Sequence, residues 1–377
     1  MLVAMNTIPP KKWTVLLYSA ADNNLHPYMV DDVAELETIG SDAQTDVVVQ
    51  IDHGREGGAA GADRLKVEKF SRDQQNPHGP IQSPVLEKMG QVNMSSAYTL
   101  SSAVQWAMKN YPSEHFMLVI SDHGNAWKGC AQDDSARGWM SVPEIKAGLA
   151  QAQKETGKKI DVLGFDCCLM ANLETAYQLR DQASYMVASE MTEGADGWPY
   201  QPIMTPDSLK TMSQRLDMEP GDLATMLVDK SGTTPSIHTL SAIDLSKMDA
   251  VRQPMIELRQ AIVDTPHTQA ELRAIWKETT RFYGYRDAGD WAHQLNAKTE
   301  DPVLQDKAVA AQAAIRAAVI AEDHHGPYAG ASGMTLQVHK SSDLSYRNLE
   351  FEKDVKWSQA QERIGGVDDP KSPRFEE

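Results

Sequence analysis

The sequence has few cysteines and no long apolar run. Its three cysteines are the adjacent Cys167 and Cys168 and the isolated Cys130. Adjacent cysteines rarely pair, so no disulfide framework is expected, although the count does not exclude secretion. No stretch approaches the roughly eighteen apolar residues of a membrane span. Residues 1–13 lack a leader's apolar segment and cleavage signal, so we expect either a cytoplasmic protein or a secreted one whose leader was removed.

Positive charge and several common binding motifs are also scarce. The formal net charge is −17, which argues against a nucleic-acid partner and fits a basic ligand or simple solubility. The motifs CxxC and HExxH are absent, so no zinc site is expected. The glycine-rich stretch 53–63 lacks GxxxxGK[ST] and is better explained as a flexible hairpin tip than as a phosphate cradle. His324 and His325 are interpreted as surface residues.

What the chain does contain is an alternation of buried strands and helices. Its 377 residues, 41% hydrophobic and 24% charged, suffice for a packed core. The alternation predicts an α/β fold with a mostly parallel sheet covered by helices. Expected strands lie at 12–20, 45–52, 64–70, 115–121, 160–165, 184–190, 237–245 and 333–338, and expected helices at 22–38, 95–110, 142–155, 206–216, 219–231 and 246–265.

These elements suggest three parts. Residues 12–235 form the core domain. Residues 236–364 form a mainly helical C-terminal region that returns a strand to that core. Residues 365–377 form a disordered tail, because they are polar and rich in proline and charge.

Reactive side chains follow two of the buried strands. Asp166, Cys167 and Cys168 come at the end of one strand, and His123 ends another in the run HFMLVISDHGN. The carboxyl ends of parallel strands are where open α/β sheets bind ligands. The helical pattern after Cys168 predicts a lowered thiol pKa, because a helix N-terminus favours the thiolate. The two strand ends therefore predict one Cys–His site.

Alternation of side chains along a strand places Asp166 and Cys168 on one side and Cys167 on the other. Cys168 is therefore favoured as the nucleophile and Cys167 as a packed apolar residue. The backbone amides of Gly124 and Cys168 are the expected oxyanion donors. A buried inert thiol and a turn histidine are the structural alternatives. Composition and spacing alone leave an enzyme and a binding module equally open.

Four segments resemble the clostripain family of cysteine peptidases. They are LLYSAADNNL at 16–25, FMLVISDHGNAW at 116–127, IDVLGFDCCLMANLETAYQLR at 160–180 and ASEMTEGADGWPY at 188–200. The resemblance implies a caspase-like αβα sandwich, a dyad of His123 and Cys168, and cleavage after basic residues. The family usually has a small residue where this chain has Cys167, which leaves the choice of nucleophile to a direct test.

Two acids explain the expected preference for a basic P1 residue. Asp166 lies on the nucleophile's side of its strand, and by resemblance Asp196 is the second acid of the primary specificity pocket. Paired carboxylates favour a bidentate arginine, with lysine as the alternative. Asp196 as a plain turn residue is the competing interpretation. Trp198 is expected either to wall this pocket or to pack in the core.

Family members often cut themselves between the catalytic residues. Arg137, in an exposed polar loop, is the expected site here, and Lys128 is the nearest rival. No cofactor is required by the proposed chemistry, whereas calcium is compatible with the family and with acids such as Asp133 and Asp134. We expect a monomer acting on peptides or proteins with a basic P1 residue. The alternative functions are a thiol amidase for small basic compounds and a non-catalytic interaction module on the same fold.

Overall fold

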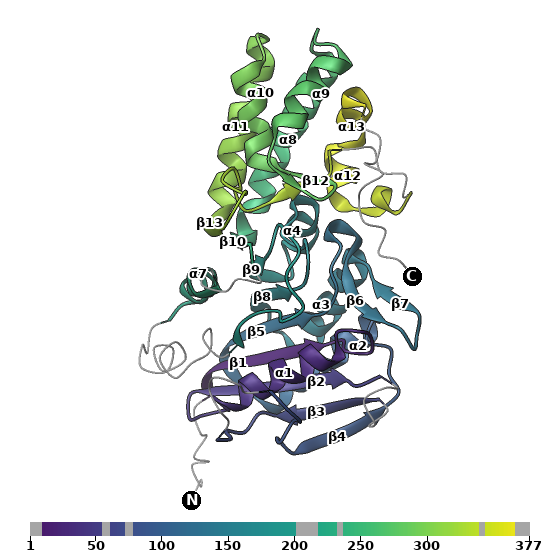
Figure 1. The fold of residues 1–377 in the computed structure, drawn as a ribbon, viewed down its shortest axis with the longest axis vertical. Coiled ribbons are helices and arrows are strands. Elements are labelled where there is room, and N and C mark those ends of the chain that lie inside the picture. Colours follow the sequence, from purple (N-terminus) through teal and green to yellow (C-terminus); the bar gives the residue numbers. More distant parts are fainter. Residues whose placement is uncertain are drawn as a thin grey trace, which may run out of the picture.

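A nine-stranded sheet positions the rest of the chain. The computed structural model describes residues 10–54, 61–71, 78–200, 218–231, 237–338 and 344–365. The strands of the main sheet are β1 (Lys11–Ser19), β2 (Thr45–Asp52), β3 (Ala62–Lys66), β4 (Val85–Gly90), β5 (Ser113–Ser121), β8 (Ile160–Asp166), β9 (Ala183–Ala188), β10 (Thr239–Asp244) and β13 (Val319–His324). Their order is β13-β10-β9-β8-β5-β1-β2-β3-β4 (Figure 1). The central strands β2, β1, β5, β8 and β9 run parallel, and the outer strands pair antiparallel.

Helices cover both faces of this sheet because side chains along each strand alternate between two apolar clusters. In β1, Leu16 and Tyr18 point to one face, whereas Val15 and Leu17 point to the other. The first face carries α2 (Ala97–Asn110), α3 (Val142–Thr156) and α4 (Leu173–Leu179), and the second carries α1 (His26–Glu37) and α7 (Pro220–Ser231). The predicted α/β fold with a parallel sheet centre between helical layers is confirmed.

The C-terminal part is mainly helical and extends from one end of the sheet, at the top of Figure 1. Two of its strands, β10 and β13, join the main sheet. Its other elements are η2 (Leu245–Lys247), α8 (Met248–Asp264), α9 (Gln269–Glu278), β11 (Arg281–Phe282), β12 (Tyr285–Asp287), α10 (Ala288–Lys298), α11 (Pro302–Ala318), β14 (Thr335–Leu336), η3 (Leu344–Asn348), α12 (Glu350–Val355) and α13 (Ser358–Ile364).

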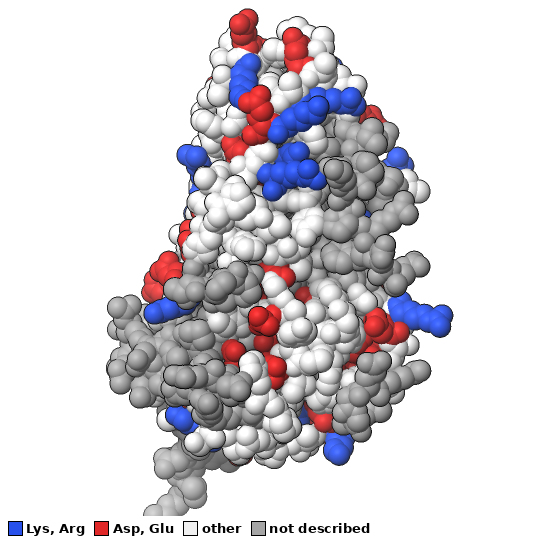
Figure 2. Space-filling view, viewed as in Figure 1, with Lys and Arg blue, Asp and Glu red and all other residues white. Residues whose placement is uncertain are grey.

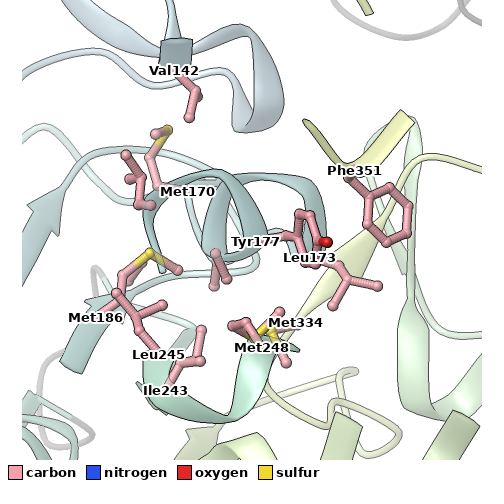
Figure 3. Packing of buried hydrophobic residues seen from close by; sticks show 14 of the residues in the cluster. Val142, Met170, Leu173, Tyr177, Met186, Ile243, Leu245, Met248, Met334 and Phe351 are labelled. Atoms are coloured by element: carbon pink, nitrogen blue, oxygen red, sulfur yellow. The ribbon is translucent and has the colours of Figure 1, made fainter. Parts of the chain in front are cut away.

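Helix α4 connects this C-terminal part to the central strands. Figure 3 shows Leu173 and Tyr177 of α4 packed among Met248, Met334 and Phe351 of the C-terminal elements. Polar contacts add to this packing, since the Tyr177 hydroxyl donates to Asp354 at 2.7 Å. The helix that follows Cys168 is therefore held by residues far away in the sequence.

Several expectations about local structure need correction. The polar loop expected around Arg137 is part of a hairpin of β6 (Cys130–Asp133) and β7 (Gly138–Met140), which follows the short helix η1 (Ala126–Lys128). The strand expected at 333–338 is the short β14, which pairs with β12 in a separate three-stranded sheet. Strand β4 was not expected, because its exposed edge position leaves little apolar pattern.

Other expectations fall largely outside the described residues. These are the helix at 206–216, most of the stretch 53–63, and the tail beyond residue 365. Among the helices that the structure describes, none has the length and apolarity needed to span a membrane.

Candidate active site

The turns that follow β5 and β8 pack directly against each other. In the parallel register Ser121 pairs with Asp166, and the Asp122 amide donates to the Asp166 carbonyl oxygen at 3.1 Å. Beyond this point Gly124 lies so close to the second turn that an added Cβ would sit 2.3 Å from the Cys168 carbonyl oxygen. Such an approach is open only to glycine. The structure therefore brings His123, Gly124 and Cys168 to one edge of the sheet.

The imidazole of His123 is oriented by Asn24, a residue that the sequence did not point to. Asn24 lies in the turn after β1, and its Oδ1 atom is 2.8 Å from His123 Nε2. Because an amide oxygen only accepts, Nε2 carries the hydrogen and the ring's lone pair is on Nδ1. Burial lowers the pKa of His123, and the carboxylate of Asp134 partly opposes this. The ring is therefore neutral at pH 7 and able to accept a proton.

Asp122, also missed from the sequence, fixes the turn that carries His123. Its buried carboxylate accepts a hydrogen bond from Asn23 Nδ2 at 2.7 Å and another from the Gln132 amide. These bonds tie the turn after β5 both to the turn after β1 and to the β6–β7 hairpin. The signal available in the sequence was an acid immediately before His123.

Cys168 is partly exposed, and its thiol is held in the protonated form. The thiol donates to the carbonyl oxygen of Glu193 at 3.8 Å. Burial, followed by the nearby carboxylate of Glu193, raises the pKa of Cys168 to about 11. The expectation of a lowered pKa was wrong. Helix α4 begins only at Leu173, and a helix terminus acts over about one turn. The thiol therefore needs a base before it can react.

Cys167 occupies a different environment. It is buried in the apolar cluster on the α2–α3 face, and its thiol donates to the carbonyl oxygen of Ile120 at 3.3 Å. Burial raises its pKa well above the ordinary value. A thiol in this state packs as a small apolar residue, as side-chain alternation predicts.

The carboxylate of Asp166 lies on the opposite, α1 face of the sheet. It accepts hydrogen bonds from the Trp198 amide at 3.0 Å and from the Tyr200 hydroxyl at 2.8 Å. Burial raises the pKa of Asp166 to about 6, against the lowering effect of these bonds. The indole of Trp198 is buried against Gly164, where an added Cβ would lie 2.9 Å from the ring. Asp196, in the same loop, is exposed.

Glu193 is a third acid at this site that sequence reasoning missed. Its Oε1 accepts from Trp198 Nε1 at 3.3 Å, and its carboxyl group contacts that of Asp166. Burial and the Asp166 charge raise the pKa of Glu193 well above its usual range. The backbone amide of Cys167 also interacts with this carboxyl group and partly opposes the rise in its pKa. In the sequence, Glu193 could have been noticed as an acid shortly before Asp196, the residue assigned to the specificity pocket.

The matching family model covers most of this architecture. Residues 17–310 match the model of the clostripain family. The chain belongs to the clostripain family of cysteine proteases. The match includes β5, β8 and β9 and both turns of the site.

Individual relatives are distant. Clostripain of Hathewaya histolytica is 23% identical over 223 residues, a match that spans 51% of this chain and 41% of that protein. The fold resembles that of iotapain, a secreted C11 cysteine protease of Bacteroides thetaiotaomicron (TM-score 0.70, 16% identity, 92% of this chain and 100% of that chain). It also resembles a C11 protease of Parabacteroides distasonis described as an inactive zymogen (TM-score 0.68, 21% identity, 93% and 99%).

The residue expected to be cut in this clostripain-family chain lies at the end of a hairpin. Arg137 is exposed in the turn between β6 and β7, where it has a positive φ of 52°. Lys128, its rival, is exposed in η1. Both lie between His123 and Cys168 in the sequence, and neither is enclosed by the fold.

Three buried carboxylates could hold a hard cation. Oxygens of Asp22, Asp52 and Asp133 lie within 4.8 Å of one another, whereas the exposed Asp134 is not part of this cluster. Carboxylate oxygens are the ligands that calcium prefers. Backbone amides already donate to this cluster, including Gly54 to Asp52 at 3.0 Å and Met94 to Asp133 at 2.8 Å. Calcium therefore stays a prediction for this family member.

The contact between Asn24 and His123 predicts an electrostatic response. Replacing Asn24 by aspartate places a carboxylate beside Nε2, and a negative charge at that distance stabilises the imidazolium. We expect the pKa of His123 to rise by about one pH unit or more. Histidine ring NMR titration measures it, and Asn110→Asp, at the end of α2, serves as the control. An unchanged pKa of His123 in Asn24→Asp would contradict the contact between His123 Nε2 and Asn24.

Proposed function

We propose that this protein is a cysteine endopeptidase that cleaves after arginine, and also after lysine. Cys168 is the nucleophile, His123 the proton-transfer partner, and the amides of Gly124 and Cys168 the oxyanion donors. The observation that carries the proposal is the packing of Gly124 against the Cys168 backbone, which places both turns at one point. Membership of the clostripain family supports the same chemistry.

The proposed reaction begins from a neutral pair. His123 Nδ1 accepts the thiol proton as Cys168 Sγ attacks the scissile carbonyl carbon, and the two amides bind the oxyanion. The C–N bond then breaks as His123 returns the proton to the leaving nitrogen. Water, activated by the same imidazole, hydrolyses the thioester. The raised pKa of Cys168 supports proton transfer during the attack on the carbonyl carbon rather than before it.

The acids on the α1 face supply the preference for a basic P1 residue. Asp166 is buried and accepts hydrogen bonds from Trp198 and Tyr200. A guanidinium that binds there loses water, and the attraction between the two charges is stronger in the low-dielectric interior. The exposed Asp196 would bind the other edge of the cation. Trp198 contributes by holding the Asp166 carboxylate through its amide, in addition to its packing on Gly164. Glu193, whose pKa is raised by burial and by the Asp166 charge, is a further acid beside this pair.

Self-processing after Arg137 is part of the proposal. The residue is exposed at a hairpin turn, and its side chain has the charge that an acidic pocket selects. The distant relative from Parabacteroides distasonis is described as an inactive zymogen, which is compatible with activation by cleavage. The calcium expectation adds no step to the proposed chemistry.

The choice of nucleophile is tested by two alanine variants. We expect Cys168→Ala to lower turnover of a fluorogenic arginyl peptide about 10³-fold or more, because the attacking sulfur is lost. Cys167→Ala removes a thiol that packs in the core and should retain most of the activity. Circular dichroism checks that both variants are folded. Loss of activity in Cys167→Ala alone would reverse the assignment, and turnover of small amidines without peptides would favour the thiol amidase.

The raised pKa of Asp166 predicts a pH-dependent preference for charge. Below about pH 6 the carboxyl group becomes neutral and no longer attracts a cation, so discrimination in favour of arginine is lost as the pH falls. The measurement is the ratio of kcat/KM for peptides with P1 arginine and P1 citrulline from pH 5 to 8. The titration of His123 changes kcat/KM equally for both peptides and cancels in the ratio. The pH dependence that remains comes from the acidic pocket. A ratio that does not fall below pH 6 would contradict the role of Asp166.

Cleavage after Arg137 has a direct readout. Incubation of the purified chain should yield a fragment whose N-terminal sequence begins at Gly138. Arg137→Ala should remain intact, whereas Lys128→Ala should be cut like the wild type. Full activity from a wild-type chain that stays intact would exclude processing as a requirement.

A further inference from the structure

A cavity of about 770 Å³ opens beside His123, away from the acids of the α1 face. Its lining comes from separate parts of the chain, namely the turns after β1 and β5, η1, the β6–β7 hairpin, the start of α3, and η3 with the residue that follows it. The indoles of Trp127 and Trp139 and the side chain of Leu349 supply apolar surface, whereas Gln132 adds a side-chain amide. A cavity of this size with mixed walls is typical of a binding site.

The cavity and the acids lie on different sides of Cys168. Trp198 and Tyr200, which hold Asp166, belong to the apolar cluster of the α1 face. Trp127 and Leu349 belong instead to a separate cluster, against which the Cys168 side chain packs. Cys168 therefore contacts both groups, because its thiol donates to the carbonyl oxygen of Glu193 and its side chain packs against the cluster that supplies part of the cavity wall. No described aspartate or glutamate lines the cavity.

The chemistry of amide cleavage indicates which side of the scissile bond lies in the cavity. The base that accepts the thiol proton later donates it to the leaving nitrogen, so the leaving peptide must lie beside His123. His123 lines the cavity. We propose that this cavity binds the residues on the carboxyl side of the scissile bond. This inference rests on the proposed function, since it concerns the same Cys168 and His123.

The walls of the cavity define the side chain that it takes. Among the described lining residues Lys128 is the one lysine or arginine, and none is an aspartate or glutamate. The Lys128 ammonium lies 5.6 Å from the ring centroid of Trp127, so charge and apolar surface occur together. The cavity favours a large apolar residue, accepts an acidic one and disfavours a basic one. This preference is the opposite of that of the acidic pocket.

The chain itself contains a sequence of this kind. Arg137 is followed by Gly138 and Trp139, which puts an aromatic residue at the second position after the proposed cut. In the uncut chain Trp139 already forms part of the cavity wall, and its Nε1 donates to the Lys128 carbonyl oxygen at 3.1 Å. Gly138 has no side chain that a cavity could select, so we place the selective contact at the second residue after the scissile bond.

Internally quenched peptides test this preference. All share the same residues up to P1 arginine, followed by glycine, and differ only in carrying tryptophan, serine, glutamate or lysine at the next position. We expect the tryptophan peptide to be cleaved with a kcat/KM about tenfold above that of the lysine peptide, with serine and glutamate between them. Lys128→Glu should raise kcat/KM for the lysine peptide and lower it for the glutamate peptide.

Two controls separate this inference from the function on which it rests. Lys109→Glu makes the same charge change on the exposed end of α2 and should leave the order of the four peptides unchanged. Trp139→Ala should lower cleavage of the tryptophan peptide more than that of the serine peptide, whereas Trp106→Ala, outside the cavity, should affect both equally. Equal cleavage of all four peptides, with no shift in Lys128→Glu, would overturn the inference and leave the peptidase intact. No cleavage of any arginyl peptide would overturn both.

Discussion

The close approach of Gly124 to the Cys168 backbone is the constraint on which the rest of the site depends. Parallel pairing of β5 with β8 aligns Ser121 with Asp166, so the two turns leave the sheet at the same level. Any side chain at position 124 would meet the Cys168 carbonyl oxygen and force the turns apart. Because His123 immediately precedes this glycine, separation of the turns would also separate imidazole and thiol. The geometry of the proposed reaction is thus set by backbone packing.

Two buried carboxyl groups determine the electrostatics of the site. Asp166 and Glu193 share a desolvated space behind Cys168, and burial raises the pKa of both carboxyl groups. Burying charge without a partner costs free energy, and this cost is tolerated where a ligand later supplies the opposite charge. A cationic P1 side chain would relieve this charge, and its binding is therefore coupled to protons that leave the acids.

Sequence patterns predicted which strand ends meet at the candidate site. His123, Gly124 and Cys168 follow recognisable buried strands, and neighbouring parallel strands end at one edge of the sheet. Asn24 was missed because its contact with His123 requires β1 to lie beside β5, a pairing across distant segments. The shift in the pKa of Cys168 was predicted in the wrong direction. The pattern showed a nearby helix but not the burial or the Glu193 carboxylate.

The same limit applies to the larger structure. The α/β fold follows from alternating buried strands and helices, each of which is a local pattern. The β6–β7 hairpin was not predicted, because its strands of four and three residues are too short to show an apolar alternation. The support of α4 by the C-terminal part depends on contacts such as that between Tyr177 and Asp354, which no local pattern encodes.

The contrast between the two sides of Cys168 has a consequence for substrate direction. On one side lie Asp166, Glu193 and Asp196, and on the other a cavity with Lys128 and apolar walls. A basic peptide bound in reverse would place its cation beside Lys128 and leave the buried carboxylates without a partner. Such a mismatch disfavours the wrong orientation, in addition to the attraction that favours the right one. The contrast in charge concerns the residues that line the cavity, since the carboxylate of Asp134 also acts on His123 from outside that lining.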